Sequence, residues 1–305
     1  MSEYKLDKWD LSELARDPKS PAFQKQINDL EALAKKFEKI KSRLDPKMPS
    51  KKFMDILHEV EEISEKMSRI GGYASLSYSA DTQSDEATSL MTRMSKLGSE
   101  ISNKILFFDL WWKTQVDDKN AKRLIKESGE LSEYLSHKRL FAKYALSEPE
   151  EKIINTLDVT GISALVKLHD KMISAYEYKM MVSGKIKKMT REEITNYIRS
   201  TNPKIRETAY KTILTKYAEN KGVIGEIYQN IVLNWKDEGI EIRGYKSPIS
   251  MRNIGNNVDD KTIESLLTVC RENSPVFQKF FTQKAKMLKM KKLRRYDLYA
   301  PAAAN

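Results

Sequence analysis

The chain has 305 residues, of which 32% are charged and 40% hydrophobic, and its formal net charge at pH 7 is +11. This balance is typical of a folded soluble chain and excludes a disordered one. No apolar run approaches the roughly 20 residues that span a bilayer, and Met1–Asp10 lacks the apolar core of a signal peptide. The single cysteine, Cys270, excludes an internal disulfide framework, so the expected compartment is the cytoplasm.

Glycine and proline are scarce, which favours helices over turns. Apolar residues at steps of three or four predict helices over residues 23–44, 53–78 and 90–112. Asp45-Pro46 is expected to end the first helix, and Gly71-Gly72 to kink the second only locally. These three segments predict an antiparallel bundle or a helical wall joined by short polar loops.

The second half of the chain carries clear capping signals. Ser147 and Glu150 form a capping box at the start of a helix, and Asn202-Pro203 places an N-cap before a proline at the first helical position. In the latter helix, Ile205, Ala209, Ile213 and Leu214 are expected to form the buried side. Residues 181–186 predict one hairpin with Gly184 in its turn, which must pack on helices because a lone hairpin is marginal.

We therefore predict an all-α fold of elongated multi-helix lobes with one small β-hairpin. A soft boundary near residues 115–120 divides the chain into an N-terminal helical lobe, residues 1–115, and a second helical region, residues 120–305. The sequence contains no internal repeat and no low-complexity linker.

The three histidines do not have the spacing of a zinc site. His58-Glu59 matches the start of a His-Glu-x-x-His helix, but Glu62 stands where the second histidine is needed. His58 and Glu62 share a helix face, so a weak two-ligand site is an alternative to a solvated charged face. His169 is expected to be a core residue and His137 a surface residue, so the sequence predicts no metal site.

Other catalytic patterns are also missing. Cys270 lies among apolar residues of a predicted helix, where cysteine usually behaves as a small buried hydrophobe. The chain has no glycine-rich phosphate loop and no G-x-S-x-G turn.

Residues 284–295 hold seven basic side chains interleaved with leucine and methionine. A basic amphipathic helix of this kind binds nucleic acid, acidic lipid or a partner, or packs its apolar side on another domain. We expect the helix over residues 276–293 to expose an apolar face of this kind.

Five short motifs appear in a fixed order along the chain. They are Y-A-S-L-S-Y-S-A-D-T at 73–82, L-S-E-P-E-E followed by Thr160-Gly161 at 146–161, N-P-K-I-R-E-T-A-Y at 202–210, R-G-Y-K-S-P at 243–248 and Y-D-L-Y-A-P at 296–301. Together they resemble the oligoendopeptidase F family, helical zinc metallopeptidases related to thimet oligopeptidase.

The resemblance implies two helical lobes around a deep channel in which oligopeptides are hydrolysed in the cytosol. In that family a zinc ion is held by a His-Glu-x-x-His helix and a downstream glutamate, all later in the chain than the motifs found here. No catalytic or metal residue can therefore be assigned in this sequence. Tyr245, Arg252 and Asn256, in the polar stretch after the Trp235 helix, are candidates to line the substrate channel, with structural loop roles as the alternative.

The resemblance thus predicts the N-terminal, substrate-channel half of a zinc metalloendopeptidase, inactive alone. Its partners would be oligopeptide substrates and a C-terminal catalytic domain that supplies the zinc site. The alternative is a non-enzymatic basic helical module that binds nucleic acid or an acidic partner, and the charge alone favours a solvated lysine-rich surface over nucleic acid. The end at Asn305 fits an engineered end, a truncation or a short gene.

Overall fold

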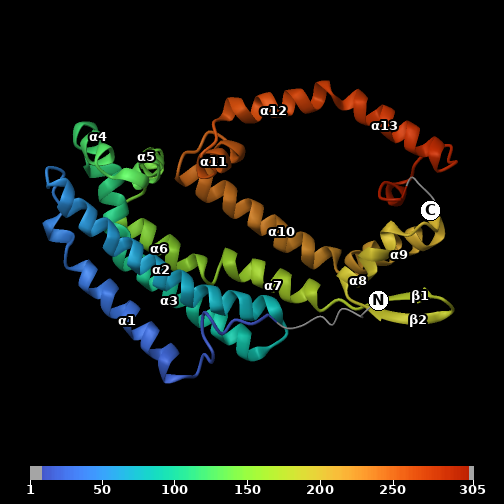
Figure 1. Cartoon of the computed structure of the whole chain (residues 1–305), viewed down its shortest axis with the longest axis horizontal. Coiled ribbons are helices and arrows are strands. Elements are labelled where there is room, and N and C mark those ends of the chain that lie inside the picture. Colours follow the sequence, from blue (N-terminus) through green and yellow to red (C-terminus); the bar gives the residue numbers. More distant parts are fainter. Residues whose placement is uncertain (1–8, 302–305) are drawn as a thin grey trace. The chain divides into compact units, whose positions relative to one another are not determined.

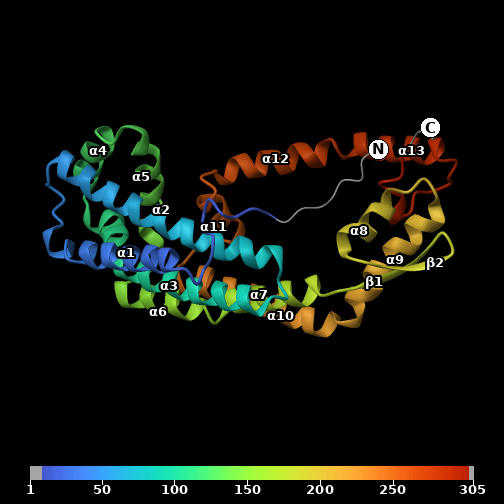
Figure 2. The same cartoon turned by 60° about the horizontal axis from the view of Figure 1, so that its bottom comes forward.

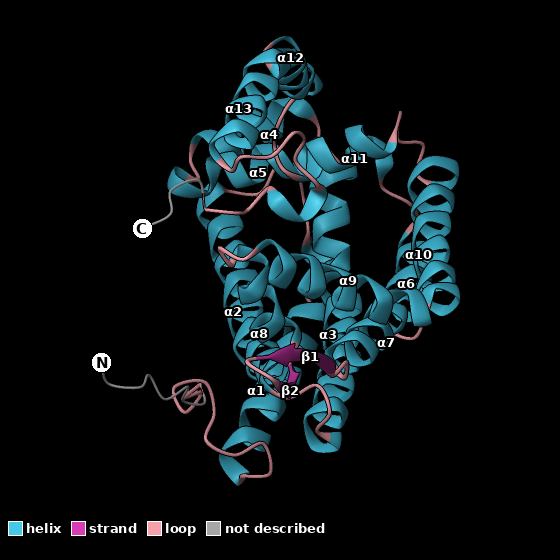
Figure 3. Ribbon diagram, turned by 90° about the vertical axis from the view of Figure 1, so that its right-hand side faces the viewer, coloured by secondary structure: helices cyan, strands magenta, loops and turns pink. Residues whose placement is uncertain are grey.

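A computed structural model describes residues 9–301. Residues 1–8 and 302–305, which include most of the N-terminal polar segment and the alanine-rich tail, lie outside the described residues. Helices dominate, and the strands form one antiparallel hairpin (Figures 1 and 3). This confirms the predicted all-α fold with one small hairpin.

The longer elements are α1 (Pro21–Glu38), α2 (Ser50–Ala80), α3 (Asp85–Leu110), α4 (Asp118–Lys126), α5 (Ser132–Arg139), α6 (Glu148–Asp158), α7 (Ile162–Ser174), β1 (Tyr178–Val182), β2 (Lys185–Met189), α8 (Arg191–Asn196), α9 (Pro203–Glu219), α10 (Lys221–Trp235), α11 (Pro248–Gly255), α12 (Asp260–Glu272) and α13 (Ser274–Met287). Two π-helical segments, Trp111–Gln115 and Lys236–Ile242, extend α3 and α10.

Contacts divide the chain into two compact units. Unit 1 comprises Met1–Leu165 and Lys236–Lys246, and unit 2 comprises Val166–Trp235 and Ser247–Asn305. The boundary predicted near residues 115–120 lies inside unit 1, between the first π-helical segment and α4. The division into lobes 1–115 and 120–305 stays a prediction.

The core of unit 1 is built by α1, α2 and α3, which lie side by side (Figures 1 and 2). Each carries the apolar stripe expected from its spacing, and the three stripes face one another. Phe53 of α2 is fully buried, with its ring 6.2 Å from that of Phe108 and 5.2 Å from that of Trp112. Aromatic packing therefore joins the start of α2 to the end of α3.

The first helix is shorter than its apolar spacing predicts. It ends at Glu38, and the chain continues through a 3₁₀ turn at Lys41–Arg43 before Leu44 adopts an extended conformation. The second helix instead runs through Gly71-Gly72 without interruption, as its apolar positions predict.

The π-helical end of α3 is fixed by α5. Trp112 donates from Nε1 to the carbonyl oxygen of Leu135 at 3.0 Å, and Arg139 donates to the carbonyl oxygens of Trp112 and Val116 at 2.9 and 2.8 Å. These carbonyls lie at the helix C-terminus, where a cation is favourable.

In unit 2 the hairpin forms where Gly184 predicts it. Ser183 and Gly184 have φ values of 50° and 77°, as the two central positions of a type I′ turn require. The pairing runs from Val182 opposite Lys185 to Tyr178 opposite Met189. One face of the hairpin packs on α8 and α9, around a cluster that includes Ile194. The predicted packing of the hairpin on helices is confirmed.

Within residues 9–301, no helix combines the length and the apolar character that crossing a membrane requires.

We predict that Phe53→Ala lowers the free energy of unfolding by about 3–5 kcal/mol, because the cavity lies among rings that cannot close over it. Urea unfolding followed by circular dichroism measures the change. The control is Phe277→Ala, since Phe277 is 59% exposed and its loss should change stability by about 0.5 kcal/mol or less. Equal effects of the two variants would contradict the assignment of the core.

Candidate functional site

The histidines lie in three different settings. His58 is exposed and contacts Glu61 through Nδ1 at 2.7 Å, whereas Glu62 pairs with Lys66 at 3.5 Å. His137 packs edge-on against Phe141. Among the described residues, no group of three or more His, Cys, Asp or Glu side chains could hold a metal ion. The residues present therefore do not fit a zinc ion of the kind that the resemblance implies.

Two expectations about single residues are wrong. His169 is not a core residue hydrogen-bonded to backbone: its side chain is one-third exposed and contacts the carboxylate of Asp170 at 3.1 Å. Cys270 is exposed rather than buried. Cys270 lies on α12, where no residue is buried, so the apolar stripe of that helix does not bury it.

The three candidate substrate residues fall in different places. Tyr245 belongs to unit 1 and is buried, whereas Arg252 and Asn256 belong to unit 2 and are exposed on α11 and at its C-cap. The stretch is less loop-like than expected, because a π-helical segment follows Trp235 and α11 begins at Pro248. A role of these residues in substrate binding stays a prediction.

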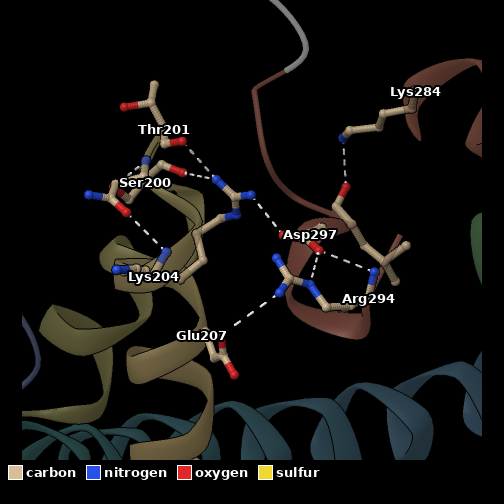
Figure 4. Close-up of polar contacts among 10 residues, drawn as sticks. Ser200, Thr201, Lys204, Glu207, Lys284, Arg294 and Asp297 are labelled. Atoms are coloured by element: carbon tan, nitrogen blue, oxygen red, sulfur yellow. Dashed lines mark hydrogen bonds and ion pairs between the residues drawn. The ribbon is translucent and has the colours of Figure 1, made fainter. Parts of the chain in front are cut away.

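Unit 2 contains a fully buried ion pair. Arg206 of α9 donates to Asp297 at 2.7 Å, and the two side chains are 2% and 0% exposed. Nη1 of Arg206 donates to the carbonyl oxygens of Ser200 at 2.7 Å and Thr201 at 3.0 Å, whereas its buried Nε has no hydrogen-bond partner among the described residues. Arg294 donates from Nε to the second carboxylate oxygen of Asp297 at 2.9 Å (Figure 4).

Burial alone would raise the pKa of Asp297, but the hydrogen bonds from Arg294 and Arg206 lower it below its usual value. The carboxylate is therefore ionised at neutral pH. A ring contact lies beside the ion pair, where Tyr210 and Tyr296 have centroids 5.9 Å apart. Lys284 of α13 also donates to the carbonyl oxygen of Leu298 at 2.7 Å (Figure 4).

Arg206 was not expected to be buried. The predicted inner side of α9 included Leu214, which is 50% exposed. Arg206 lies next to Ile205 and one turn before Ala209 and Tyr210, so it shares the inner face of the helix. A charged residue beside such a stripe is a signal for a buried pair, but nothing local identifies Asp297 as its partner.

Unit 1 contains a similar arrangement. Arg243 binds both carboxylate oxygens of Glu151, at 2.7 and 2.9 Å, and donates from Nε to Glu238 at 2.8 Å. Burial would raise the pKa of Glu151, but hydrogen bonds from Arg243 and from the N–H of Leu146 lower it. A two-fold contact between guanidinium and carboxylate fixes both groups in one plane.

A stacked pair of tyrosines lies beside this ion pair. The rings of Tyr144 and Tyr245 are 3.7 Å apart and nearly parallel. Burial raises the pKa of Tyr245 above its usual value. Tyr245 therefore packs within unit 1, against the segment that precedes α6.

Four of the five sequence motifs are joined by these contacts. R-G-Y-K-S-P supplies Arg243 and meets Glu151 of L-S-E-P-E-E, while N-P-K-I-R-E-T-A-Y supplies Arg206 and meets Asp297 of Y-D-L-Y-A-P. Each unit thus contains an arginine–carboxylate pair next to a pair of tyrosines. These four motifs supply the residues of the two ion pairs, and none of them belongs to a metal-binding group among the described residues.

α12 and α13 present apolar side chains without cover. No residue of α12 is buried within the described part of the chain, and the neighbours that Figures 1 and 2 show in unit 2, α11 and α13, lie at its two ends. Both helices carry exposed apolar residues, which are Leu266, Leu267, Val269, Val276, Phe277, Phe280 and Met287. The expected apolar face is confirmed, but the helix ends at Met287 instead of running to residue 293.

We predict that Arg206→Met lowers the free energy of unfolding of unit 2 by about 3–5 kcal/mol, because Asp297 loses its buried partner. Hydrogen exchange in α9 and in the segment around Asp297 should report the loss. Arg199→Met is the matched control, because Arg199 is exposed in the same unit. The double variant Arg206→Met with Asp297→Leu should recover part of the lost stability. An unchanged free energy of unfolding in Arg206→Met would contradict the stabilising role of the ion pair.

A second prediction concerns acid stability of unit 1. Because the pKa of Glu151 is lower in the folded than in the unfolded chain, its contribution is present above the unfolded value of about 4.3 and is lost as the pH falls through the folded value. We expect hydrogen-exchange protection of α6 to fall over this acid range. In Glu151→Gln the fall should be smaller, while Glu130→Gln, at an exposed position of the same unit, serves as the control. An unchanged fall in Glu151→Gln would contradict the assignment.

Comparison with known proteins identifies relatives over almost the whole chain. Residues 114–178, which include Tyr144 and Glu151, match the family described as Oligopeptidase F. The Oligoendopeptidase F homolog of Borreliella burgdorferi is 25% identical over 97% of this chain and 49% of its own length. Oligopeptidase PepF of Bacillus subtilis is 21% identical over 97% of this chain and 44% of its own length.

A solved structure shows the same fold. The crystal structure of oligoendopeptidase-F from Enterococcus faecium superposes with a TM-score of 0.80 at 20% identity, over 93% of this chain and 56% of that one. The chain spans about half the length of these relatives. These matches confirm the resemblance of the chain to the oligoendopeptidase F family.

Proposed function

We propose that the chain is the N-terminal, substrate-channel half of an oligoendopeptidase F-like zinc metalloendopeptidase that hydrolyses oligopeptides in the cytoplasm. The observation that carries the proposal is that 97% of the chain aligns with only about half of each of two relatives. In this proposal the zinc and its ligands belong to the other half. The role of the present chain is to bind and enclose the peptide.

The exposed faces of α12 and α13 support a partner. Isolated helices of 13 and 14 residues are marginal in water, because most helical stability in proteins comes from packing an apolar face. Phe277 and Phe280 are 59% and 57% exposed, so this face lacks such packing within unit 2. In the proposal the catalytic half covers it, and Tyr245, Arg252 and Asn256 remain candidates for contact with substrate.

One observation favours a second candidate function. Between Ser274 and Arg295 the chain has eight basic and no acidic residues. A basic module that binds nucleic acid or an acidic partner would use this segment, and its binding should then weaken steeply with salt.

The test reads the gene beyond codon 305 and compares the 305-residue chain with the longer chain that the proposal expects it to encode. We expect the longer chain to contain a His-Glu-x-x-His helix, to bind zinc and to cleave a fluorescence-quenched nonapeptide. The 305-residue chain should neither bind zinc stoichiometrically nor cleave this peptide. Zinc-dependent cleavage by the 305-residue chain, or a longer frame without the motif, would overturn the proposal.

Variants of the longer chain test the docking face. Phe277→Glu with Phe280→Glu should impair cleavage, because two carboxylates would be buried against the catalytic half. Ile186→Glu is the control, since Ile186 is 68% exposed on the hairpin of the same unit. Salt-dependent binding of a DNA duplex by the 305-residue chain would instead favour the second candidate.

A further inference from the structure

A groove lies between strand β1 and helix α9 of unit 2. Its volume is about 710 Å³, which lies within the range of ligand-binding pockets. Helix α9 contributes Thr208, Thr212 and Thr215, which recur at helical spacing on one face, and the strand side contributes Tyr178 and Lys179. Lys211, Lys216 and Glu219 of α9 and Glu177 before β1 also line the groove, so it is polar and carries charges of both signs.

Two buried phenols line this groove without a hydrogen-bond partner. The hydroxyl groups of Tyr176 and Tyr178 are both inaccessible to solvent and unpaired within residues 9–301. Burial raises the pKa of Tyr178 to about 12, with a further contribution from Tyr217, although no hydrogen bond of normal length joins the two. The phenol is thus protonated at neutral pH. A buried hydroxyl without a partner is costly, which indicates that a ligand supplies an acceptor.

The strand wall offers donors and acceptors of its own. In a hairpin with a two-residue turn, Val182 pairs with Lys185 through hydrogen bonds, and every second residue after that does the same. The backbone N–H and C=O of Lys179 and Met181 therefore point away from β2. Because the sheet has only two strands, this edge of β1 has no neighbouring strand within the described residues.

We propose that this groove binds an extended peptide that carries acidic side chains and adds to β1 as a third strand. The edge supplies backbone hydrogen bonds, and the phenols of Tyr176 and Tyr178 donate to peptide carbonyls. Lys179 forms no ion pair with any residue of the described chain and would bind a carboxylate. A second copy of the hairpin is disfavoured at this edge, since lysines on both edges would repel each other.

This inference goes beyond the proposed function. It rests on the strand edge, the groove and the unpaired phenols, and it requires neither zinc nor the other half of a peptidase. Loss of peptide binding and loss of peptide cleavage are therefore separate outcomes.

The experiment titrates the 305-residue chain into a fluorescein-labelled octapeptide of alternating threonine and glutamate and follows fluorescence anisotropy. Two derivatives carry backbone N-methyl groups, one on the odd and one on the even residues. A peptide that adds as a strand donates through only one of these sets, so one derivative should bind normally and the other should lose binding about tenfold or more. A peptide of alternating threonine and lysine should bind more weakly than the glutamate peptide.

Variants of the chain locate the site. Lys179→Pro removes the outward N–H without removing a hydrogen bond of the β1–β2 pair, and it should weaken binding more than Lys179→Ala, which keeps the N–H. Thr215→Trp should block the groove from the helix side. Tyr178→Phe should weaken binding about fivefold while leaving urea unfolding unchanged, because it removes an unpaired hydroxyl.

Circular dichroism of each variant verifies its fold. If Lys179→Pro fails to fold, Thr215→Trp alone tests whether the peptide binds in the groove. The proposal is overturned if the native chain does not bind the glutamate peptide at millimolar concentration. It is also overturned if both N-methylated peptides bind equally, or if Thr215→Trp leaves binding unchanged.

Discussion

The buried pair of Arg206 and Asp297 is the constraint on which unit 2 depends. The two residues are 91 positions apart, and neither charge is accessible to solvent. Removing either partner would leave an uncompensated charge in the interior, so the segment around Asp297 must return to α9 whenever the unit folds. Arg294 also binds Asp297, and Lys284 of α13 binds the carbonyl oxygen of Leu298. These contacts hold the end of α13 near α9.

Unit 1 follows the same principle with different geometry. Arg243 and Glu151 are 92 positions apart and meet through two parallel hydrogen bonds beside the stacked rings of Tyr144 and Tyr245. The chain passes through unit 2 between these positions and must re-enter unit 1 at Lys236. Four of the five motifs therefore lie where segments that are distant in the sequence meet within each unit.

The surfaces that remain uncovered differ in chemical character. The face formed by α12 and α13 is apolar and flanked by lysine and arginine, so it favours a large protein partner that buries it. The groove beside β1 is polar and contains unpaired donors, so it favours a short polar ligand. A chain with both features would hold a partner domain at one site and a peptide at the other.

The sequence by itself determined the local structure. The stripes of α2 and α3, the caps at Ser147 and Asn202 and the turn at Ser183-Gly184 agree with the sequence, because each depends on residues within a few positions of one another. Only the tertiary structure decided that Arg206 is buried, that Leu214 and Cys270 are exposed, and which carboxylate meets each arginine. Periodicity identifies the apolar side of a helix, but burial depends on whether a distant segment covers that side. The partners of Arg206 and Arg243 lie about ninety residues away, at separations that no local pattern encodes.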